Sequence, residues 1–437
     1  MNRGRHDLLN TKSLSPSTRR GRRVAMILSG GGARGAYEVG VLSYVLDGFA
    51  RRRGAPPRID VLCGTSVGAI NACFLAAHLA DATLGIRRLV DLWTELNLAR
   101  VLGFGLRQAL SVHRVVLGGG VDAAGLFDVT PMTQLIEREI PWRAIARTLR
   151  HGHLSALSVS ATEVSSGRTV IFMQTGPDST LPTTAPPRTV IRGALIGPVH
   201  ALASAAIPIL FPPVRIGREL FMDGGVRQNT PIAPALRLGA THVFAVGLSR
   251  EVRGVESGGE DQKPPGAAMV LGKVLNAFLL DHVQSDYEVL TRVNRMIEDG
   301  EAVYGSDFLR GLNKEVAARG DLPYRHVHSL VVRPSEDIGR LAASYVRSGA
   351  LRHGGGLTRR ILSLLDVGEA TEADLASYLL FDGSFAKKLI DLGRADAEAR
   401  RHEIAEFFGS ASEDGAPQSS DDPSDGDGWT MPPPAIG

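Results

Sequence analysis

Cysteine is scarce in this sequence: Cys63 and Cys73 are the two thiols among 437 residues, and both lie in apolar stretches. Two thiols make a poor disulfide framework or metal cage. We expect both to be buried as small apolar side chains, which is most compatible with a reducing compartment. The expected location is therefore the cytoplasm.

Net charge is also low, at +3, so no overall excess of positive charge indicates binding to nucleic acid. The charge is concentrated at the two ends instead. Residues 1–23 carry seven Lys or Arg and one Asp, whereas residues 410–437 carry six Asp or Glu and no Lys or Arg. We predict a disordered basic tail and a disordered acidic tail. Because a basic arm can touch anionic lipid, peripheral association with a membrane stays open.

Uninterrupted apolar runs of membrane-spanning length are missing as well. Residues 61–80 and 196–214 are long enough to cross a bilayer, but glycine, serine and threonine interrupt the first and four prolines interrupt the second. Between the basic tail and the first glycines lie only residues 24–28, too few for the apolar part of a signal peptide. We expect buried segments of a globular protein rather than membrane spans.

Short apolar runs alternate with helical patterns along the chain. Residues 24–28 and 59–63 are almost wholly apolar, and each leads through glycine into apolar side chains at helical spacing. Strands without a polar face belong in a parallel sheet that is covered on both sides. Further strands are predicted at 155–161, 169–174, 242–248 and 328–332. The expected fold class is α/β, with a three-layer α/β/α arrangement around a mainly parallel sheet.

The part of the sequence after residue 250 is predicted to be largely helical. Residues 251–267 read as a polar, exposed flap, and residues 268–298 as a helix with one apolar face. After the last strand, helical patterns at 337–347, 357–366, 370–381 and 384–407 predict a helical C-terminal region. Residues 101–106 and 268–298 are candidates for lipid contact, although packing within the protein explains such stretches more often.

The residues 64–68, GTSVG, fit the pattern G-x-S-x-G with Ser66 at its centre. In such an elbow the serine occupies a tight, strained turn between a strand and a helix, and Gly64 and Gly68 leave room for neighbouring chains. The pattern alone arises easily by chance. Here an apolar strand precedes it and a helical pattern follows it. Ser66 is therefore predicted to be a nucleophile at a helix N-terminus.

The residues 30–35, GGGARG, allow two interpretations. They fit the dinucleotide fingerprint G-x-G-x-x-G, and they fit a glycine-rich oxyanion hole, whose backbone N–H groups stabilise a developing negative charge. A dinucleotide site needs an acid that closes the second strand, whereas Asp60 opens that strand. We therefore favour the oxyanion hole over the dinucleotide site and over merely structural glycines.

Asp223 follows an apolar strand and precedes Gly224 and Gly225. A carboxylate at such a strand end could serve as the base for a serine. A turn aspartate that only caps the two glycines is the alternative, and taken alone it would be the better interpretation.

Together, these patterns resemble the patatin-like phospholipase family. The resemblance covers about residues 24–248, and more weakly the chain to about residue 335. It rests on G-G-G-x-R-G at 30–35, G-x-S-x-G at 64–68, D-G-G at 223–225 and the block ASAAIPILFPP at 203–213. The short motif GLFD at 125–128 is also similar to the family. The tails and the C-terminal helices lie outside the resemblance.

The resemblance implies a serine esterase that hydrolyses fatty acyl esters of phospholipids or lysophospholipids without a metal or organic cofactor. Its site would be a dyad of Ser66 and Asp223 rather than a triad. Asp223 would take the proton of Ser66 directly. The oxyanion hole would be formed by Gly30, Gly31, Gly32 and Arg34. Arg34 would lend positive potential or bind a lipid phosphate, unless it forms a surface salt bridge.

Two rival functions stay open. A Ser–His–Asp triad in the order of the α/β-hydrolases needs a histidine after Asp223, and the candidates are His242, His282, His326, His328 and His353. A non-catalytic nucleotide-binding or lipid-binding module would use Ser66 only as a turn residue.

The expected organisation is a basic tail at 1–23, a catalytic domain at 24–335, a helical C-terminal region at 336–409 and an acidic tail at 410–437. Head group, chain length and oligomeric state are left open by the sequence.

Overall fold

A computed structural model of the protein describes residues 21–103, 125, 127–227, 231–250, 273, 281–349 and 374–409. Residues 1–20 of the predicted basic tail, the acidic tail, the flap at 251–267 and the helix expected at 357–366 lie outside the described residues. The last residue of the predicted basic tail, Arg23, is bound to the domain, because its backbone N–H donates to Thr241 and its guanidinium donates to Ser179. Within them, one nine-stranded sheet runs through the molecule in the order β5-β4-β3-β2-β1-β8-β9, and a β6–β7 hairpin attaches to β3. The strands are β1 (Val24–Leu28), β2 (Val61–Thr65), β3 (Ala156–Glu163), β4 (Thr169–Thr175), β5 (Thr189–Gly193), β6 (Val214–Ile216), β7 (Glu219–Asp223), β8 (His242–Val246) and β9 (His328–Val332).

The sheet is mainly parallel, as predicted. β3, β2, β1, β8 and β9 pair in parallel, with Ala25 opposite Val61 and His242 opposite His328. β4 and β7 run antiparallel to β3, and β5 runs parallel to β4. The sequence patterns missed β5 and β6 because these strands are only partly buried and each carries an arginine within its apolar run.

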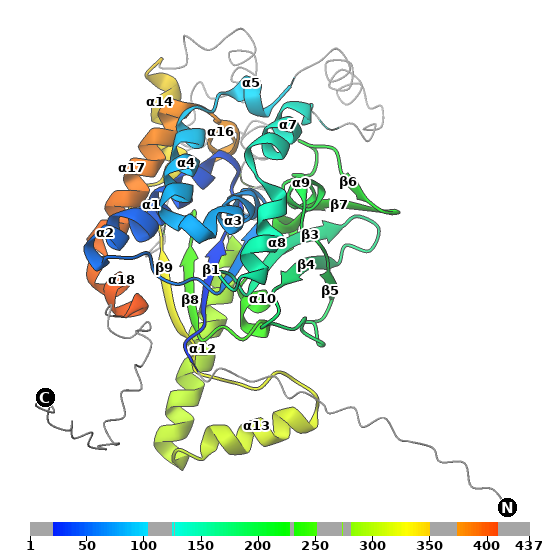
Figure 1. Ribbon diagram of the computed structural model, residues 1–437, viewed down its shortest axis with the longest axis vertical. Coiled ribbons are helices and arrows are strands. Elements are labelled where there is room, and N and C mark those ends of the chain that lie inside the picture. Colours follow the sequence, from blue (N-terminus) through cyan, green and yellow to red (C-terminus); the bar gives the residue numbers. More distant parts are fainter. Residues whose placement is uncertain are drawn as a thin grey trace, which may run out of the picture.

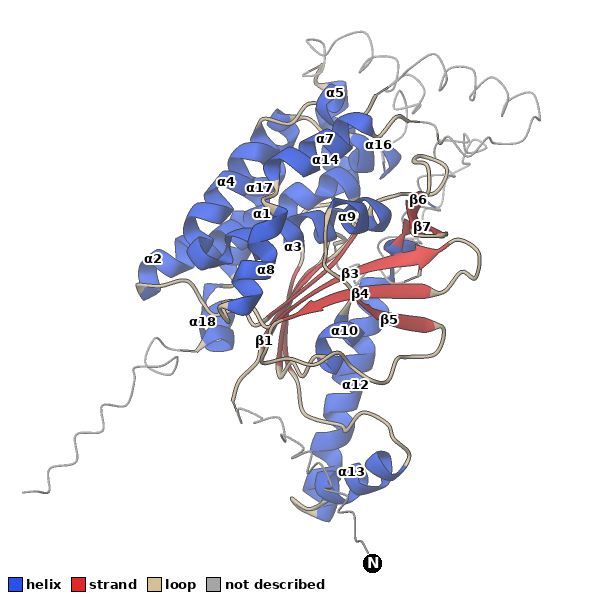
Figure 2. Ribbon diagram, turned by 45° about the vertical axis from the view of Figure 1, so that its right-hand side comes forward, coloured by secondary structure: helices blue, strands red, loops and turns tan. Residues whose placement is uncertain are grey.

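Helices cover both faces of the sheet (Figures 1 and 2), so the three-layer α/β/α class is confirmed. One face carries most of the helices and the larger apolar core, and the other carries α10 and α12 with a smaller core. The helices are α1 (Gly35–Ser43), α2 (Phe49–Arg53), α3 (Val67–His78), α4 (Ala82–Thr94), α5 (Leu98–Val101), α7 (Thr130–Glu139), α8 (Trp142–Arg150), α9 (Pro198–Ser204), α10 (Ile232–Arg237), α12 (Asp281–Tyr304), α13 (Phe308–Ala318), α14 (Ile338–Arg347), α16 (Asp374–Leu379), α17 (Gly383–Ala399) and α18 (Arg401–Phe408).

The two segments that could be mistaken for membrane spans pack inside the fold. Residues 61–80 consist of β2, the turn at Ser66, α3 and the start of a short turn, and most of them are buried. The longer stretch Val67–Thr94 is also long and apolar enough to cross a bilayer, but it consists of α3, that short turn and α4, and most of its apolar part is buried in the protein. The second segment consists of α9 and the loop that leads to β6. Cys63 and Cys73 are free and fully buried, and burial raises the pKa of the Cys63 thiol to about 12.

The C-terminal helices pack on the sheet domain rather than beside it. α17 crosses α1 so closely that a Cβ at Gly40 would lie 2.2 Å from the carbonyl oxygen of Ile390, and one at Gly393 would lie 2.3 Å from that of Tyr37. Glycine at both positions lets the two backbones touch. Asp382 begins α17 by accepting hydrogen bonds from the backbone N–H groups of Ser384 and Phe385. The single helix predicted at 384–407 is two helices, because the chain turns at Arg400.

Candidate active site

Ser66 stands at the turn between β2 and α3. Its backbone has φ 55° and ψ −128°, a conformation that residues other than glycine rarely adopt. The two flanking glycines permit this turn. A Cβ at Gly64 would lie 2.5 Å from the Cα of Ala69, and one at Gly68 would lie 2.4 Å from the carbonyl oxygen of Leu28. The turn is therefore a strained strand-to-helix elbow with the serine at its tip.

The Ser66 hydroxyl donates a hydrogen bond to Asp223, with 2.6 Å between Oγ and Oδ2. The other carboxylate oxygen, Oδ1, accepts the backbone N–H of Gly225 at 2.7 Å. Asp223 is fully buried, and this burial raises the pKa of its carboxyl to about 7, although both hydrogen bonds act in the opposite direction. A carboxyl with this pKa can exchange a proton near neutral pH.

The sheet explains how residues so far apart in sequence meet. β1 and β2 are parallel neighbours, so the glycine-rich loop after β1 and Ser66 after β2 emerge at the same edge. β7 runs antiparallel to β3 and pairs Asp223 with Ala161, near the carboxyl end of β3. The last residue of β7 therefore reaches the same edge as the elbow.

Ser204, which the sequence patterns did not single out, connects the elbow to β3. Its hydroxyl accepts the backbone N–H of Ser66 at 2.9 Å and donates to the carbonyl oxygen of Ser160 at 2.6 Å. Ser204 is fully buried at the end of α9. Its place within the block at 203–213 is the sequence signal that could have identified it.

The glycine-rich loop is tightly enclosed. A Cβ at Gly31 would lie 2.4 Å from a methyl group of Leu248, and Gly32 has φ +57°. Gly32 and Ser66 line the same cavity. Arg34 is not at the surface: it is 3% exposed, and its Nε donates to the hydroxyl of Ser377 at 2.7 Å. The burial of Arg34 excludes a surface salt bridge.

A buried polar network supports this loop from α1. Glu38, fully buried, accepts the backbone N–H of Ser29 at 2.6 Å and the side-chain amide of Asn71 at 3.1 Å. Asn71 in turn accepts the indole N–H of Trp93. Burial raises the pKa of Glu38 to about 8. An acid within an otherwise apolar helix was the available signal for this residue.

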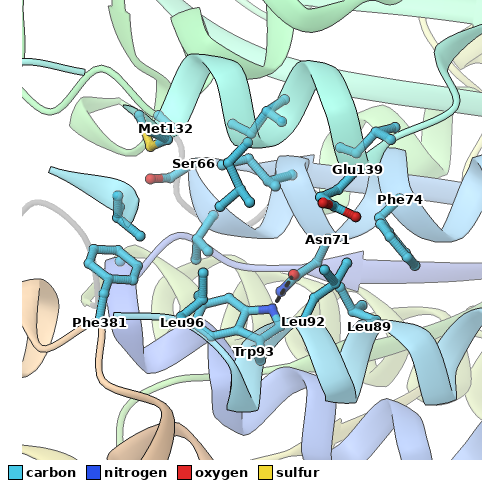
Figure 3. Close-up of a pocket in the computed structure, with 18 of the residues that line it drawn as sticks. Ser66, Asn71, Phe74, Leu89, Leu92, Trp93, Leu96, Met132, Glu139 and Phe381 are labelled. Atoms are coloured by element: carbon cyan, nitrogen blue, oxygen red, sulfur yellow. Dashed lines mark hydrogen bonds between the residues drawn. The ribbon is translucent and has the colours of Figure 1, made fainter. Parts of the chain in front are cut away.

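A largely apolar cavity of about 110 Å³ leads away from Ser66 between α3, α4 and α7 (Figure 3). Ser66 and Phe381 lie toward one end in this view, and Phe74 and Glu139 lie toward the other. Glu139 is the charged residue among the described residues that line it, and it pairs with Arg138 and Arg88. Val101 lines the cavity and Leu102 is buried, so the described start of the stretch 101–106 packs inside the protein.

The histidine candidates for a triad lie elsewhere or outside the described side chains. His242 and His328 begin β8 and β9 and stack on each other at 4.7 Å, at the edge of the sheet opposite Ser66. His326 precedes β9 and contacts Glu298. The side chain of His282 and all of His353 lie outside the described residues.

The dinucleotide interpretation needs an acid that closes the second strand, whereas β2 ends in Thr65. Asp60 accepts the backbone N–H of Val24 and pairs with Arg58, so it ties the starts of two strands together. Among the residues that the structure describes, no group of three or more His, Cys, Asp or Glu side chains is placed to hold a metal ion.

Part of the chain is similar in sequence to known proteins. Residues 26–236 match the family model described as patatin-like phospholipase. A protein of Pseudomonas aeruginosa (strain BWHPSA011 / Pa011), named cGAMP-activated phospholipase, is 30% identical over 206 residues, which are 47% of this chain and 53% of the relative. The match thus spans about half of the relative's length.

Solved structures are less similar. VipD from Legionella pneumophila is 15% identical with a TM-score of 0.29, over 71% of this chain and 61% of that one. Human GIVD cytosolic phospholipase A2, in complex with methyl gamma-linolenyl fluorophosphonate, is 11% identical with a TM-score of 0.38, over 89% and 59%. Likeness at these scores is too low to assign a function.

Proposed function

Residues 26–236 are a patatin-like phospholipase domain, and from this premise we propose that the chain hydrolyses fatty acyl esters of phospholipids or lysophospholipids with Ser66 as nucleophile and Asp223 as base. The observation that carries the proposal is the 2.6 Å hydrogen bond from Ser66, which lines an apolar cavity, to the buried carboxylate of Asp223.

The proposed reaction has two halves. As Ser66 Oγ attacks the ester carbonyl, its proton passes to Asp223, and the carbonyl oxygen becomes negative. Collapse of this intermediate breaks the bond to the alcohol, which takes the proton from Asp223 and leaves an acyl-serine. Water then gives a proton to Asp223 and attacks the acyl group, and the proton returns to Ser66 as the fatty acid departs. Asp223 is regenerated without a histidine.

The negative oxygen would be stabilised by backbone N–H groups of Gly31 and Gly32. These residues lie on the loop beside Ser66, and Gly32 lines the same cavity. Loss of one such donor typically lowers kcat by about 10²–10³. Because backbone donors cannot be deleted by substitution, the loop has to be tested through the residues that hold it.

The cavity would hold the acyl chain. Trp93, Phe74 and Ile136 are among its apolar lining residues, and each methylene that enters such a site gains about 0.8 kcal/mol from burial. Esters of longer fatty acids are therefore expected to bind more tightly until the chain reaches the charged end at Glu139.

The test uses a fluorophosphonate probe, because only an activated serine reacts with it. The wild-type protein should be labelled on Ser66 and should release fatty acid from phospholipid vesicles. Ser66→Ala should lose both properties while it keeps the wild-type melting temperature. Ser43→Ala, which removes another buried hydroxyl, is the matched control. Labelling of Ser66→Ala at the wild-type rate would refute the assignment, and vesicle binding without labelling would indicate a lipid-binding module.

The proposal extends to organisation and location. We propose a catalytic domain at 24–335, a helical C-terminal region at 336–409 and a cytoplasmic enzyme that meets its substrate at membrane surfaces. Vesicle assays with and without cGAMP are informative, because the Pseudomonas aeruginosa relative is described as activated by it.

A further inference from the structure

The short helix α16 touches the glycine-rich loop directly. A Cβ at Gly32 would lie 2.3 Å from the carbonyl oxygen of Tyr378 and 3.1 Å from its carbonyl carbon. The backbone of α16 therefore lies against the backbone of the loop, at the glycine that shares a cavity with Ser66. No side chain other than hydrogen fits between them.

Arg34 locks the two segments together. Its guanidinium lies over the ring of Tyr378, 4.5 Å from the ring centroid, and its Nε donates to Ser377 Oγ at 2.7 Å. Arg34 and Tyr378 are buried, and Ser377 is fully buried. A buried guanidinium is costly unless partners surround it, and a stacked, hydrogen-bonded arginine has one defined geometry. The position of Arg34 therefore depends on α16.

α16 is itself anchored through the residues that follow it. Next along the chain, Asp382 accepts the hydroxyl of Tyr345 in α14 at 2.6 Å and caps α17. A Cβ at Gly383 would lie 1.9 Å from the carbonyl oxygen of Thr94, at the end of α4. α17 then packs on α1, the helix that begins at the glycine-rich loop. The loop and α16 thus belong to one packed unit.

We propose that Ser377 and Tyr378 are positioning residues of the active site, which hold Arg34 and the backbone of residues 30–32 in the geometry that stabilises the oxyanion. This inference rests on the proposed function. Neither residue belongs to the matched range 26–236. In this inference α16, one of the C-terminal helices, contributes to the geometry of the catalytic site.

Catalysis depends on this geometry because donors to an oxyanion act only where they are preorganised. A displacement of about 1 Å can lower the rate by about 10². Loss of the ring beneath Arg34 should therefore reduce kcat, whereas a short soluble ester, which leaves most of the apolar cavity empty, should keep its KM.

The experiment compares Tyr378→Leu, Tyr378→Phe and Phe407→Leu on a p-nitrophenyl acetate substrate. Tyr378→Leu should lower kcat at least about 10-fold with KM within about twofold of wild type. Tyr378→Phe, which keeps the ring, should recover most of the loss. Phe407 is buried in α18 against Phe244, and its ring meets the ring of His242, the first residue of β8, edge-on. Phe407→Leu should lower the melting temperature to a similar extent and keep the wild-type kcat.

A second variant guards against misfolding. Arg34→Lys removes the stacked guanidinium from the other side, and the double variant with Tyr378→Leu should be no slower than the slower single variant, because the two residues act as a unit. Wild-type kcat in a folded Tyr378→Leu protein would overturn the inference, as would an equal loss of kcat in Phe407→Leu. Activity in Ser66→Ala would instead overturn the proposed function, so the two failures are distinguishable.

Discussion

Two parts of the chain, here called the two walls, lie against the candidate site, and they differ in how clearly sequence motifs identify them. The first wall consists of strand ends and loops between residues 24 and 248, and it carries Ser66, Asp223 and the glycine-rich loop. The second consists of α16 and α17, and it carries Ser377 and Tyr378. The first wall can be identified by glycines at fixed spacing, because the tight turns at these strand ends leave no room for side chains. The second shows only helical spacing.

The walls also differ in the kind of contact they make. Hydrogen bonds between side chains organise the first, from Ser66 to Asp223 and from Asn71 to Glu38. Backbone contacts through Gly32, Gly40 and Gly393 join the second to the first. In our proposal the first wall supplies the reacting groups, and the second wall holds the glycine-rich loop of the first wall in position.

Asp223→Asn should have the largest effect, since it removes the only base in the proposed dyad. We expect a loss of kcat of about 10²–10⁴, the range for general-base catalysis, and no further loss in the double variant with Ser66→Ala. Turnover of a short soluble ester measures this. His242→Gln, which alters a ring at the opposite edge, is the control. A folded His242→Gln protein as inactive as Ser66→Ala would favour a triad.

Gly32→Ala tests the backbone contact between the two walls. The new methyl group would clash with the carbonyl of Tyr378, and the residue would hold φ +57°. Gly54→Ala is the matched control, because Gly54 has φ +91° and nothing within 4 Å of its Cβ position. Gly54→Ala should lose about 1–2 kcal/mol of stability from backbone strain alone. Gly32→Ala should lose clearly more, together with ester turnover. Equal losses in denaturant unfolding would show that the walls do not press on each other.

Glu38→Gln should have the smallest effect, and it is visible in the pH dependence of stability. Burial raises the pKa of Glu38 to about 8 in the folded protein from its ordinary value of 4.5. The folded state therefore holds the proton more tightly, so stability falls as pH rises from about 4.5 to 8. The melting temperature of Glu38→Gln should fall less steeply across this range. Parallel curves for the two proteins would contradict a neutral, buried Glu38.

The elements of the first wall were largely predicted from the sequence, whereas the contacts of the second wall were not. The strands β1, β2, β8 and β9 were predicted within a few residues because short apolar runs bounded by polar or glycine-containing turns are typical of buried strands. The elbow and the glycine-rich loop were predicted as loops after strands, and the structure brings them together with Asp223. The burial of Arg34 was not predicted, because an arginine after three glycines gives no sign of it. Ser377 and Tyr378 were not predicted, since their contacts cross more than 300 positions of chain and no local pattern encodes them.

The most direct test of the dyad is the rate at which a fluorophosphonate labels Ser66, measured between pH 5 and 9. A base must lose its proton before it can act, and burial raises the pKa of Asp223 to about 7. Labelling of the wild-type protein should therefore rise with pH through a midpoint near 7, and Asp223→Asn should be slow at every pH. Wild-type labelling without this rise, or an Asp223→Asn protein that labels like wild type, would contradict direct activation of Ser66 by Asp223.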